Sequence, residues 1–195
     1  QSGFITVIPD YRLYPQVDWR DFLADSAAAY RWVEAYIAGF GGNPQRIFVM
    51  GHSAGAHMAA MLALDPKLQR QAGVKRQPCG LIGLAGPYDF LPISDADIRE
   101  VFKSANPLIE SQPIHYVNHH MPPMLLLTGT DDTTVKPGNT ERMAAAVKAA
   151  GGKAEVLAYP KVAHIDIMLA LAPALSGLAP TLQDTTHFIR QTSCP

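Results

Sequence analysis

The sequence predicts an α/β protein with a mostly parallel sheet and helices on both faces. Two observations support this class. Short apolar runs alternate with longer segments in which apolar residues recur at helical spacing. Several of the short runs are continuously apolar, as expected for parallel strands that are buried on both faces. With 195 residues, the chain is most simply one domain spanning residues 1–195.

Five short runs are predicted to be strands. The first ends at Pro9-Asp10, a typical turn sequence, and the later ones are followed by glycine-rich or polar loops. In chain order, the predicted strands are residues 4–9, 47–51, 81–86, 124–128 and 154–159.

The segments between these strands are predicted to be mainly helical. Asp18 is a suitable N-cap for a first helix that runs to about residue 38 with one apolar stripe. A second helix, ending before Asp65-Pro66, is apolar on nearly every side and should be buried. The sequence also predicts helix at 137–150 and a broken helical region at 165–190, and irregular structure at 67–78. The proline-rich residues 91–122 are interpreted as a small cover over the site.

A G-x-S-x-G motif lies directly between the second predicted strand and the apolar helix. It comprises Gly51, His52, Ser53, Ala54 and Gly55. In this context the serine occupies a sharp turn that raises its hydroxyl above the sheet, and glycines avoid a Cβ collision on either side. The amides at the start of the helix favour negative charge nearby. Ser53 is therefore predicted to be a nucleophile.

A serine hydroxyl needs a base, and the base needs an orienting carboxylate. In open parallel sheets such groups gather in loops at the carboxyl ends of strands. Asp131 and Asp132 follow the predicted strand 124–128, and His164 follows the strand 154–159. The chain order serine, aspartate, histidine is that of α/β-hydrolases. The residues themselves do not distinguish Asp131 from Asp132.

Other histidines are predicted to have different roles. His57 lies one helical turn beyond Ser53 on the buried helix, so a hydrogen-bonded core histidine is expected there. His115, His119 and His120 lie in a proline-rich loop without a cysteine or an H-x-x-x-H partner, so no metal site is predicted. No cofactor is predicted either.

Composition narrows the range of partners. A net charge of −1 provides no basic surface for nucleic acid and no polybasic membrane anchor, and no apolar segment is long enough to span a bilayer. Cys79 and Cys194 form neither a C-x-x-C motif nor a disulfide framework; pairing is one alternative, but two reduced thiols are expected. A cytoplasmic location is favoured, although an N-terminal targeting segment is not observable. The assembly is left open, with a homodimer as one alternative.

Four segments resemble a bacterial carboxylesterase of the α/β-hydrolase superfamily, in the esterase/lipase group that includes kynurenine-formamidase-like enzymes. They read VIPDYRLYP (residues 7–15), GGNPQRIFVMGHSAGAHMA (41–59), PPMLLLTGTDDTTV (122–135) and YPKVAHI (159–165). They occur in the family's order over nearly the whole chain. The resemblance implies that the catalytic acid, which follows Gly-Thr-x and precedes x-x-Val, is Asp132.

The resemblance also shows a departure. Similar enzymes carry a His-Gly-Gly-Gly-type oxyanion loop before the strand that residues 4–9 resemble, and this sequence begins after that point. Their strand order would also place one more strand between residues 4–9 and the strand that precedes Ser53. The sequence is therefore expected to be an N-terminally shortened fragment; the alternatives are a sheet that has closed up differently and another chain that fills the gap. The backbone amide of Ala54 is the remaining oxyanion donor.

Taken together, the sequence predicts hydrolysis of carboxylic esters, most simply short-chain ones, through an acyl-enzyme formed on Ser53. An amide-cleaving relative, such as a formamidase or peptidase, would use the same residues. A catalytically impaired binding protein with this fold is the other alternative. His52, Tyr88 and Phe90 are the candidates for lining the substrate pocket.

Overall fold

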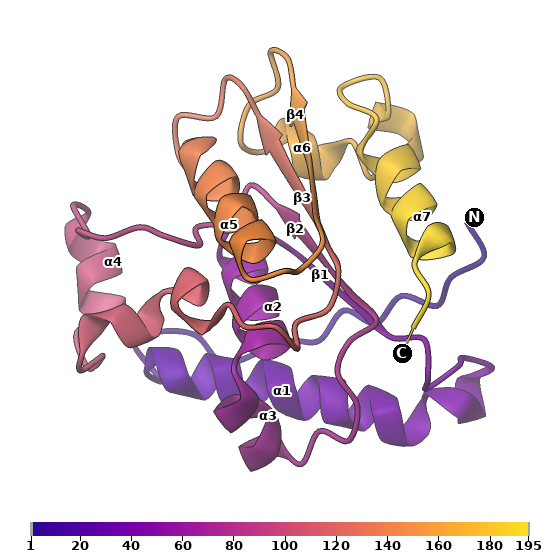
Figure 1. The fold of residues 1–195 in the computed structure, drawn as a ribbon, viewed down its shortest axis with the longest axis horizontal. Coiled ribbons are helices and arrows are strands. Elements are labelled where there is room, and N and C mark those ends of the chain that lie inside the picture. Colours follow the sequence, from indigo (N-terminus) through magenta and orange to yellow (C-terminus); the bar gives the residue numbers. More distant parts are fainter. Residues whose placement is uncertain (1, 195) are drawn as a thin grey trace.

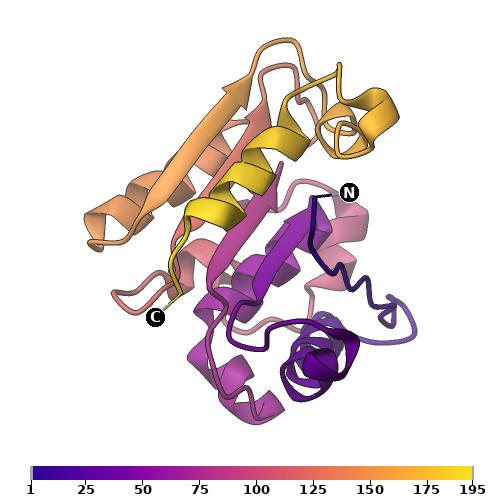
Figure 2. The same ribbon diagram turned by 90° about the vertical axis from the view of Figure 1, so that its right-hand side faces the viewer.

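The computed structural model describes residues 2–194 and contains a sheet of four parallel strands (Figure 1). The strands lie side by side in chain order, from β1 at one edge to β4 at the other (Figure 2). Their bounds are β1 (Phe48–His52), β2 (Gly80–Leu84), β3 (Met124–Gly129) and β4 (Ala154–Tyr159). The predicted α/β class and the last four predicted strands are confirmed, with small changes at the strand ends.

Helices cover both faces of this sheet (Figure 1). On one face α2 and α5 pack on the strands, and on the other face α6 and α7 do so. The α-helices are α1 (Trp19–Tyr36), α2 (Ala54–Leu64), α3 (Pro66–Ala72), α4 (Ala96–Val101), α5 (Gly138–Ala149), α6 (Asp166–Leu169) and α7 (Thr181–Gln191). Short 3₁₀ segments are η1 (Ile37–Phe40), η2 (Leu108–Ser111), η3 (Pro113–Tyr116) and η4 (Pro173–Leu175).

The central strands β2 and β3 are buried along their whole length. Alternate side chains point to opposite faces, so Leu126 packs with α2 and α5, whereas Leu125 and Leu127 pack on the α6 and α7 side. This two-sided burial explains why the two strands are apolar at every position except Thr128.

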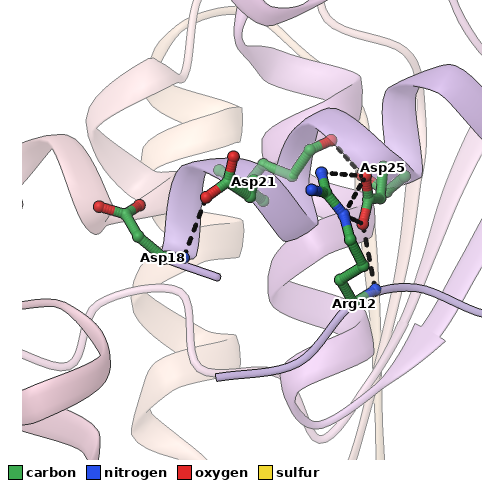
Figure 3. A network of polar contacts seen from close by, with 6 residues as sticks. Arg12, Asp18, Asp21 and Asp25 are labelled. Carbon is green, nitrogen blue, oxygen red and sulfur yellow. Dashed lines mark hydrogen bonds and ion pairs between the residues drawn. The ribbon is translucent and has the colours of Figure 1, made fainter. Parts of the chain in front are cut away.

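The first helix forms where the sequence predicts it. The Asp18 side chain accepts a hydrogen bond from the Arg20 amide, and Asp21 bonds back to the amide of Asp18, which completes a capping box. The loop before α1 is held by Arg12, whose guanidinium donates to both carboxylate oxygens of Asp25 (Figure 3). The helix itself packs on α2 and α3.

Residues 67–78 are more regular than predicted. The α3 helix begins at Pro66, whose missing N–H is no loss at a first helical position, and Asp65 caps it by accepting from the Lys67 amide at 2.8 Å. The prediction that Asp65-Pro66 ends the preceding helix is confirmed, but the same pair also starts a new one.

The predicted strand at residues 4–9 does not form. This segment is irregular and takes part in no backbone ladder within residues 2–194, and Ile8 is 88% exposed. It lies on the β1 side of the molecule (Figure 2), where β1 pairs with β2 along one edge and leaves Met50 44% exposed. An apolar β-type sequence becomes a strand only when a neighbouring strand accepts its hydrogen bonds.

The expectation of two reduced cysteines is also wrong. Cys79 and Cys194 form a disulfide that joins residues 115 positions apart in the sequence. Cys79 lies immediately before β2, and the chain after α7 returns to this end of the sheet (Figure 1). The fold brings the two thiols together, which spacing alone did not reveal.

Residues 91–122 contain α4, η2 and η3 and pack mainly on α1 and α2. Phe102 is buried against Trp19, with ring centroids 5.8 Å apart. Within residues 2–194, the structure has no helix whose length and apolarity would let it cross a membrane.

Candidate active site

Ser53 lies on the turn between β1 and α2, in a backbone conformation that is rare for a residue with a side chain. Its φ is 54° and its ψ is −120°. The amide of Ser53 donates to the carbonyl of Leu84 at 2.9 Å, so the ladder with β2 continues up to this residue. The hydrogen bond to β2 therefore holds the strained turn in place, and the turn directs the serine side chain away from the strand.

The two glycines of the motif differ in their surroundings. A Cβ on Gly51 would lie 2.1 Å from the carbonyl oxygen of Gly55, so only glycine fits at this close approach. A Cβ on Gly55 would meet nothing within 4 Å. The prediction that both positions exclude a side chain is correct for Gly51 and wrong for Gly55.

Ala54 is the first residue of α2 and is exposed. The amides of a first helical turn have no acceptor within their helix. The N–H of Ala54 therefore stands next to the Ser53 side chain with the positive end of the helix dipole behind it.

Asp132, which the family resemblance favours as the catalytic acid, and the adjacent Asp131 have very different environments. The Oδ1 atom of Asp132 accepts hydrogen bonds from the amides of Thr134 and Val135 at 2.9 and 2.8 Å. Its Oδ2 atom lies 2.7 Å from Nδ1 of His164. Asp131 is exposed and bonds only to the neighbouring Thr130 hydroxyl among the described side chains. The buried carboxylate, bonded through both of its oxygens, belongs to Asp132.

His164 connects this carboxylate to the serine. Its Nε2 atom lies 2.9 Å from Oγ of Ser53, while Nδ1 faces Asp132. A carboxylate accepts hydrogen bonds, so Nδ1 carries the proton and Nε2 is left to accept the proton of the Ser53 hydroxyl. The three side chains come from positions separated by 111 and 32 residues and form one continuous hydrogen-bonded chain.

Close backbone contacts hold the loops after β3 and β4 together. A Cβ on Gly129 would lie 2.0 Å from the carbonyl oxygen of Val162, so the end of β3 touches the loop that carries His164. The amide of Asp131 donates to the same carbonyl at 3.2 Å, and the amide of Lys161 donates to the Thr130 hydroxyl at 2.9 Å. The relative positions of the carboxylate and the imidazole thus follow from the packing of two loops.

His52 is part of this cluster. Its Nε2 atom lies 2.7 Å from the carbonyl oxygen of His164, and the two imidazole centroids are 4.6 Å apart. Burial lowers the pKa of His52, so its ring is neutral at neutral pH and Nε2 carries the donated proton. The sequence placed His52 beside the nucleophile as a pocket residue but did not reveal this contact.

The other two pocket candidates lie in different environments. Tyr88 is completely buried in the core against α2 and α5, so it packs in the interior and does not face an open pocket. Phe90 is half-buried and packs against His57 and Phe102, with ring centroids 5.8 and 5.4 Å away. His57 is a core histidine, as predicted: its Nε2 lies 2.7 Å from the Ser111 carbonyl, and burial lowers its pKa to about 4.

Chemically, this arrangement can move one proton. An imidazole with Nδ1–H held by a carboxylate can take the serine proton through Nε2 as the oxygen attacks a carbonyl carbon.

Within residues 2–194, the structure brings together no group of three histidine, cysteine, aspartate or glutamate side chains able to hold a metal ion.

Comparison with known proteins identifies the family. The BD-FAE family model matches residues 1–147. The chain belongs to the BD-FAE family. This agrees with the esterase resemblance inferred from the four sequence segments, and the match includes Ser53 and Asp132 but ends before His164.

Relatives of this BD-FAE chain are esterases by name. It is 28% identical to the isoprenylcysteine alpha-carbonyl methylesterase ICME of Arabidopsis thaliana, over 87% of this chain and 45% of the relative. It is also 28% identical to esterase LipQ of Mycobacterium tuberculosis, over 94% of this chain and 48% of the relative. The chain thus spans about half the length of these curated relatives.

Solved structures show the same fold. A truncated carbohydrate esterase from gut microbiota superposes with a TM-score of 0.79 at 18% identity, over 93% of this chain and 72% of that one. Est2 from Thermogutta terrifontis, with butyrate bound, superposes with a TM-score of 0.69 at 26% identity, over 93% of this chain and 68% of that one. The predicted α/β-hydrolase fold is confirmed.

Proposed function

We propose that this protein is a serine hydrolase that cleaves carboxylic esters with short acyl chains. The observation that carries the proposal is the hydrogen-bonded chain from Ser53 Oγ to His164 at 2.9 Å and from His164 to Asp132 at 2.7 Å. It stands on a strained turn between a buried strand and a helix N-terminus, the setting in which a serine side chain acts as a nucleophile.

The proposed reaction has two steps. In the first, His164 accepts the Ser53 proton while Oγ forms a bond to the ester carbonyl carbon, and the proton then passes to the leaving alcohol as the ester bond breaks. In the second, water attacks the acyl-enzyme with His164 again as the base, and the carboxylic acid leaves. Asp132 keeps the imidazole in the tautomer that both steps require.

The tetrahedral intermediate carries negative charge on the former carbonyl oxygen. We assign the N–H of Ala54 as a donor to this oxygen, because it opens α2 beside Ser53 and has no acceptor within its helix. Each such donor typically contributes roughly a hundred- to a thousandfold in turnover. The turnover rate of the enzyme therefore depends on how many further N–H donors reach this oxygen beside the Ala54 amide.

The comparisons support an acyl group of few carbons. Est2 of Thermogutta terrifontis has been solved with propionate and with butyrate bound, and also phosphorylated by paraoxon. Binding of the two short carboxylates by that esterase fits a short acyl chain, and its phosphorylation fits a serine hydrolase. In this proposal residues 91–122 are a cover that belongs to the same single domain, and His52 lies beside His164 at the site.

The proposal is tested by labelling and by turnover. Incubation with a fluorophosphonate followed by peptide mapping is expected to place the adduct on Ser53. Hydrolysis of p-nitrophenyl acetate and butyrate is expected to fall to background in Ser53→Ala and to stay unchanged in Ser176→Ala, which alters an exposed serine outside the site. An adduct on another residue, or undiminished hydrolysis by Ser53→Ala, contradicts the proposal. Turnover of amide substrates but not esters contradicts the assignment of the substrate class.

A further inference from the structure

The histidine next to the nucleophile makes a contact that the proton relay does not require. His52 is the last residue of β1, and its Nε2 atom lies 2.7 Å from the carbonyl oxygen of His164. A carbonyl oxygen can only accept, so the imidazole donates its N–H to the main chain of His164. Among the hydrogen bonds of residues 2–194, this is the one that reaches that carbonyl.

The sheet topology makes this contact significant. β1, which leads to Ser53, and β4, which leads to His164, are the two outer strands of the sheet. Neighbouring strands lie about 4.8 Å apart, so the ends of β1 and β4 are separated by roughly 14 Å. The loop after β4 must therefore cross the ends of β3 and β2 for His164 to reach the serine.

Two side chains form hydrogen bonds with His164, at the end of this loop that reaches Ser53. Asp132, which follows β3, binds the ring of His164 through Nδ1 at 2.7 Å. That bond fixes the tautomer and the ring, but it does not involve the main chain of His164. His52 binds the main chain itself, from the same strand that carries Ser53.

We propose that His52 is a positioning residue that ties the main chain of His164 to the end of β1 and so keeps Nε2 of His164 on Oγ of Ser53. The inference rests on the proposed hydrolase function. His52 does not take part in proton transfer; it acts through the position of His164. A shift of about 1 Å in a reacting group can cost roughly a hundredfold in rate, which sets the scale of the expected effect.

The neutral state of the His52 ring suits this role. The two imidazole centroids are 4.6 Å apart with their planes inclined by 45°, and burial lowers the pKa of His52. A neutral ring provides the single N–H that the carbonyl needs. It also places no positive charge beside His164 when that residue becomes an imidazolium during the reaction.

Three substitutions of His52 distinguish the effect of the position of its N–H donor from the effect of the size of its side chain. In His52→Gln the side-chain amide places an N–H near the position of Nε2, in His52→Asn near that of Nδ1, and His52→Leu has no donor. The kcat for p-nitrophenyl acetate is expected to fall roughly ten- to a hundredfold in the Asn and Leu variants, with KM within about twofold. The Gln variant is expected to recover to within roughly threefold of the unaltered protein.

The rate of fluorophosphonate labelling at Ser53 provides a second readout, because it requires the Ser53–His164 pair but no complete turnover. It should follow kcat across the three variants, while their melting temperatures stay close to that of the unaltered protein. Unchanged kcat in both Asn and Leu, a rise in KM alone, or a Gln variant as slow as Leu would each overturn the role of His52. Ser53→Ala, measured in parallel, tests the hydrolase proposal separately, since equal activity there removes the function itself.

Discussion

Asp132 and His164 are joined by a 2.7 Å hydrogen bond, and the carboxylate side chain is fully shielded from solvent. The oxygen that does not face the imidazole is bound by two main-chain amides, those of Thr134 and Val135. The carboxylate is thus fixed in orientation by the backbone of its own loop, with its other oxygen, Oδ2, facing Nδ1. This relationship makes the tautomer of His164 the most directly testable property of the site.

Replacing Asp132 by Asn should preserve the shape of the loop but reverse the tautomer preference of His164. An amide nitrogen facing Nδ1 favours the ring with its proton on Nε2, which then cannot accept the Ser53 proton. The kcat for p-nitrophenyl esters is expected to fall by roughly three to four orders of magnitude, with a small change in KM. Steady-state kinetics of the purified variant measures both.

Asp131→Asn is the matched control for that variant. Asp131 is adjacent in sequence and carries the same charge, but it is exposed and its side chain bonds to Thr130 instead of His164. Its kcat and KM are expected to stay within about twofold of the unaltered protein, because a solvated surface charge has little influence on the site. If Asp131→Asn loses more activity than Asp132→Asn, the assignment of the carboxylate is wrong.

The two glycines of the serine turn provide a second comparison. Gly51→Ala places a methyl group 2.1 Å from the carbonyl oxygen of Gly55, so β1 and α2 must move apart. We expect a lowered melting temperature and a loss of activity of at least roughly a hundredfold. Gly55→Ala adds a methyl group to open space and should leave the melting temperature and kcat nearly unchanged. Thermal unfolding and esterase assays on both variants decide this, and equal effects would contradict the packing described for the turn.

His57 predicts a pH dependence of stability. Its pKa falls from 6.5 to about 4 on folding because the ring, which projects from α2, is buried beside Phe90 and Phe102. There it bonds to the Ser111 carbonyl. Between these two pH values the unfolded chain binds more protons than the folded one. The contribution of neutral His57 is therefore complete above pH 6.5 and is lost as the pH falls toward 4. Over this range the free energy of unfolding should decrease by about 3 kcal/mol from this residue.

Urea unfolding followed by tryptophan fluorescence measures the contribution of His57 to the free energy of unfolding when the unaltered protein is compared with His57→Gln. The glutamine can still donate to the Ser111 carbonyl but does not titrate, so its stability should fall less steeply with acid. The difference between the two proteins isolates His57 from the carboxylates that titrate in both. Parallel curves from about pH 7 down to about pH 4.5 would show that the ring is not held neutral by the fold.

The disulfide predicts a redox effect on stability that leaves the active site alone. It closes a loop with a sequence separation of 115 residues, and in the chain-entropy account such a loop adds up to about 5 kcal/mol of stability. Reduction, or Cys194→Ser, should lower the melting temperature. Esterase activity below that temperature should persist, because Cys79 lies before β2, at the end of the sheet opposite to Ser53. Thiol titration of the denatured, unreduced protein checks the bond directly, and two free thiols would contradict it.

Much of the fold follows from local sequence. The continuous apolar runs of β2 and β3 and the capped, amphipathic α1 depend on residues within one or two turns of each other, so their pattern is visible in the sequence. Residues 4–9 show where this reasoning stops. Their composition is that of a strand, but the hydrogen bonds of a strand come from a neighbour, and composition does not supply one.

The same division holds for the site. The sequence alone determined that Ser53 stands on a turn between a strand and a helix, and that an aspartate and a histidine follow later strands in the order of an α/β-hydrolase. The family resemblance favoured Asp132 over Asp131, but only the tertiary structure shows the Asp132 carboxylate bonded to His164. Only the tertiary structure, too, shows that His52 bonds to the main chain of His164. The reason is physical: a turn conformation is set by adjacent residues, whereas a hydrogen bond between loops depends on where the whole sheet carries their backbones.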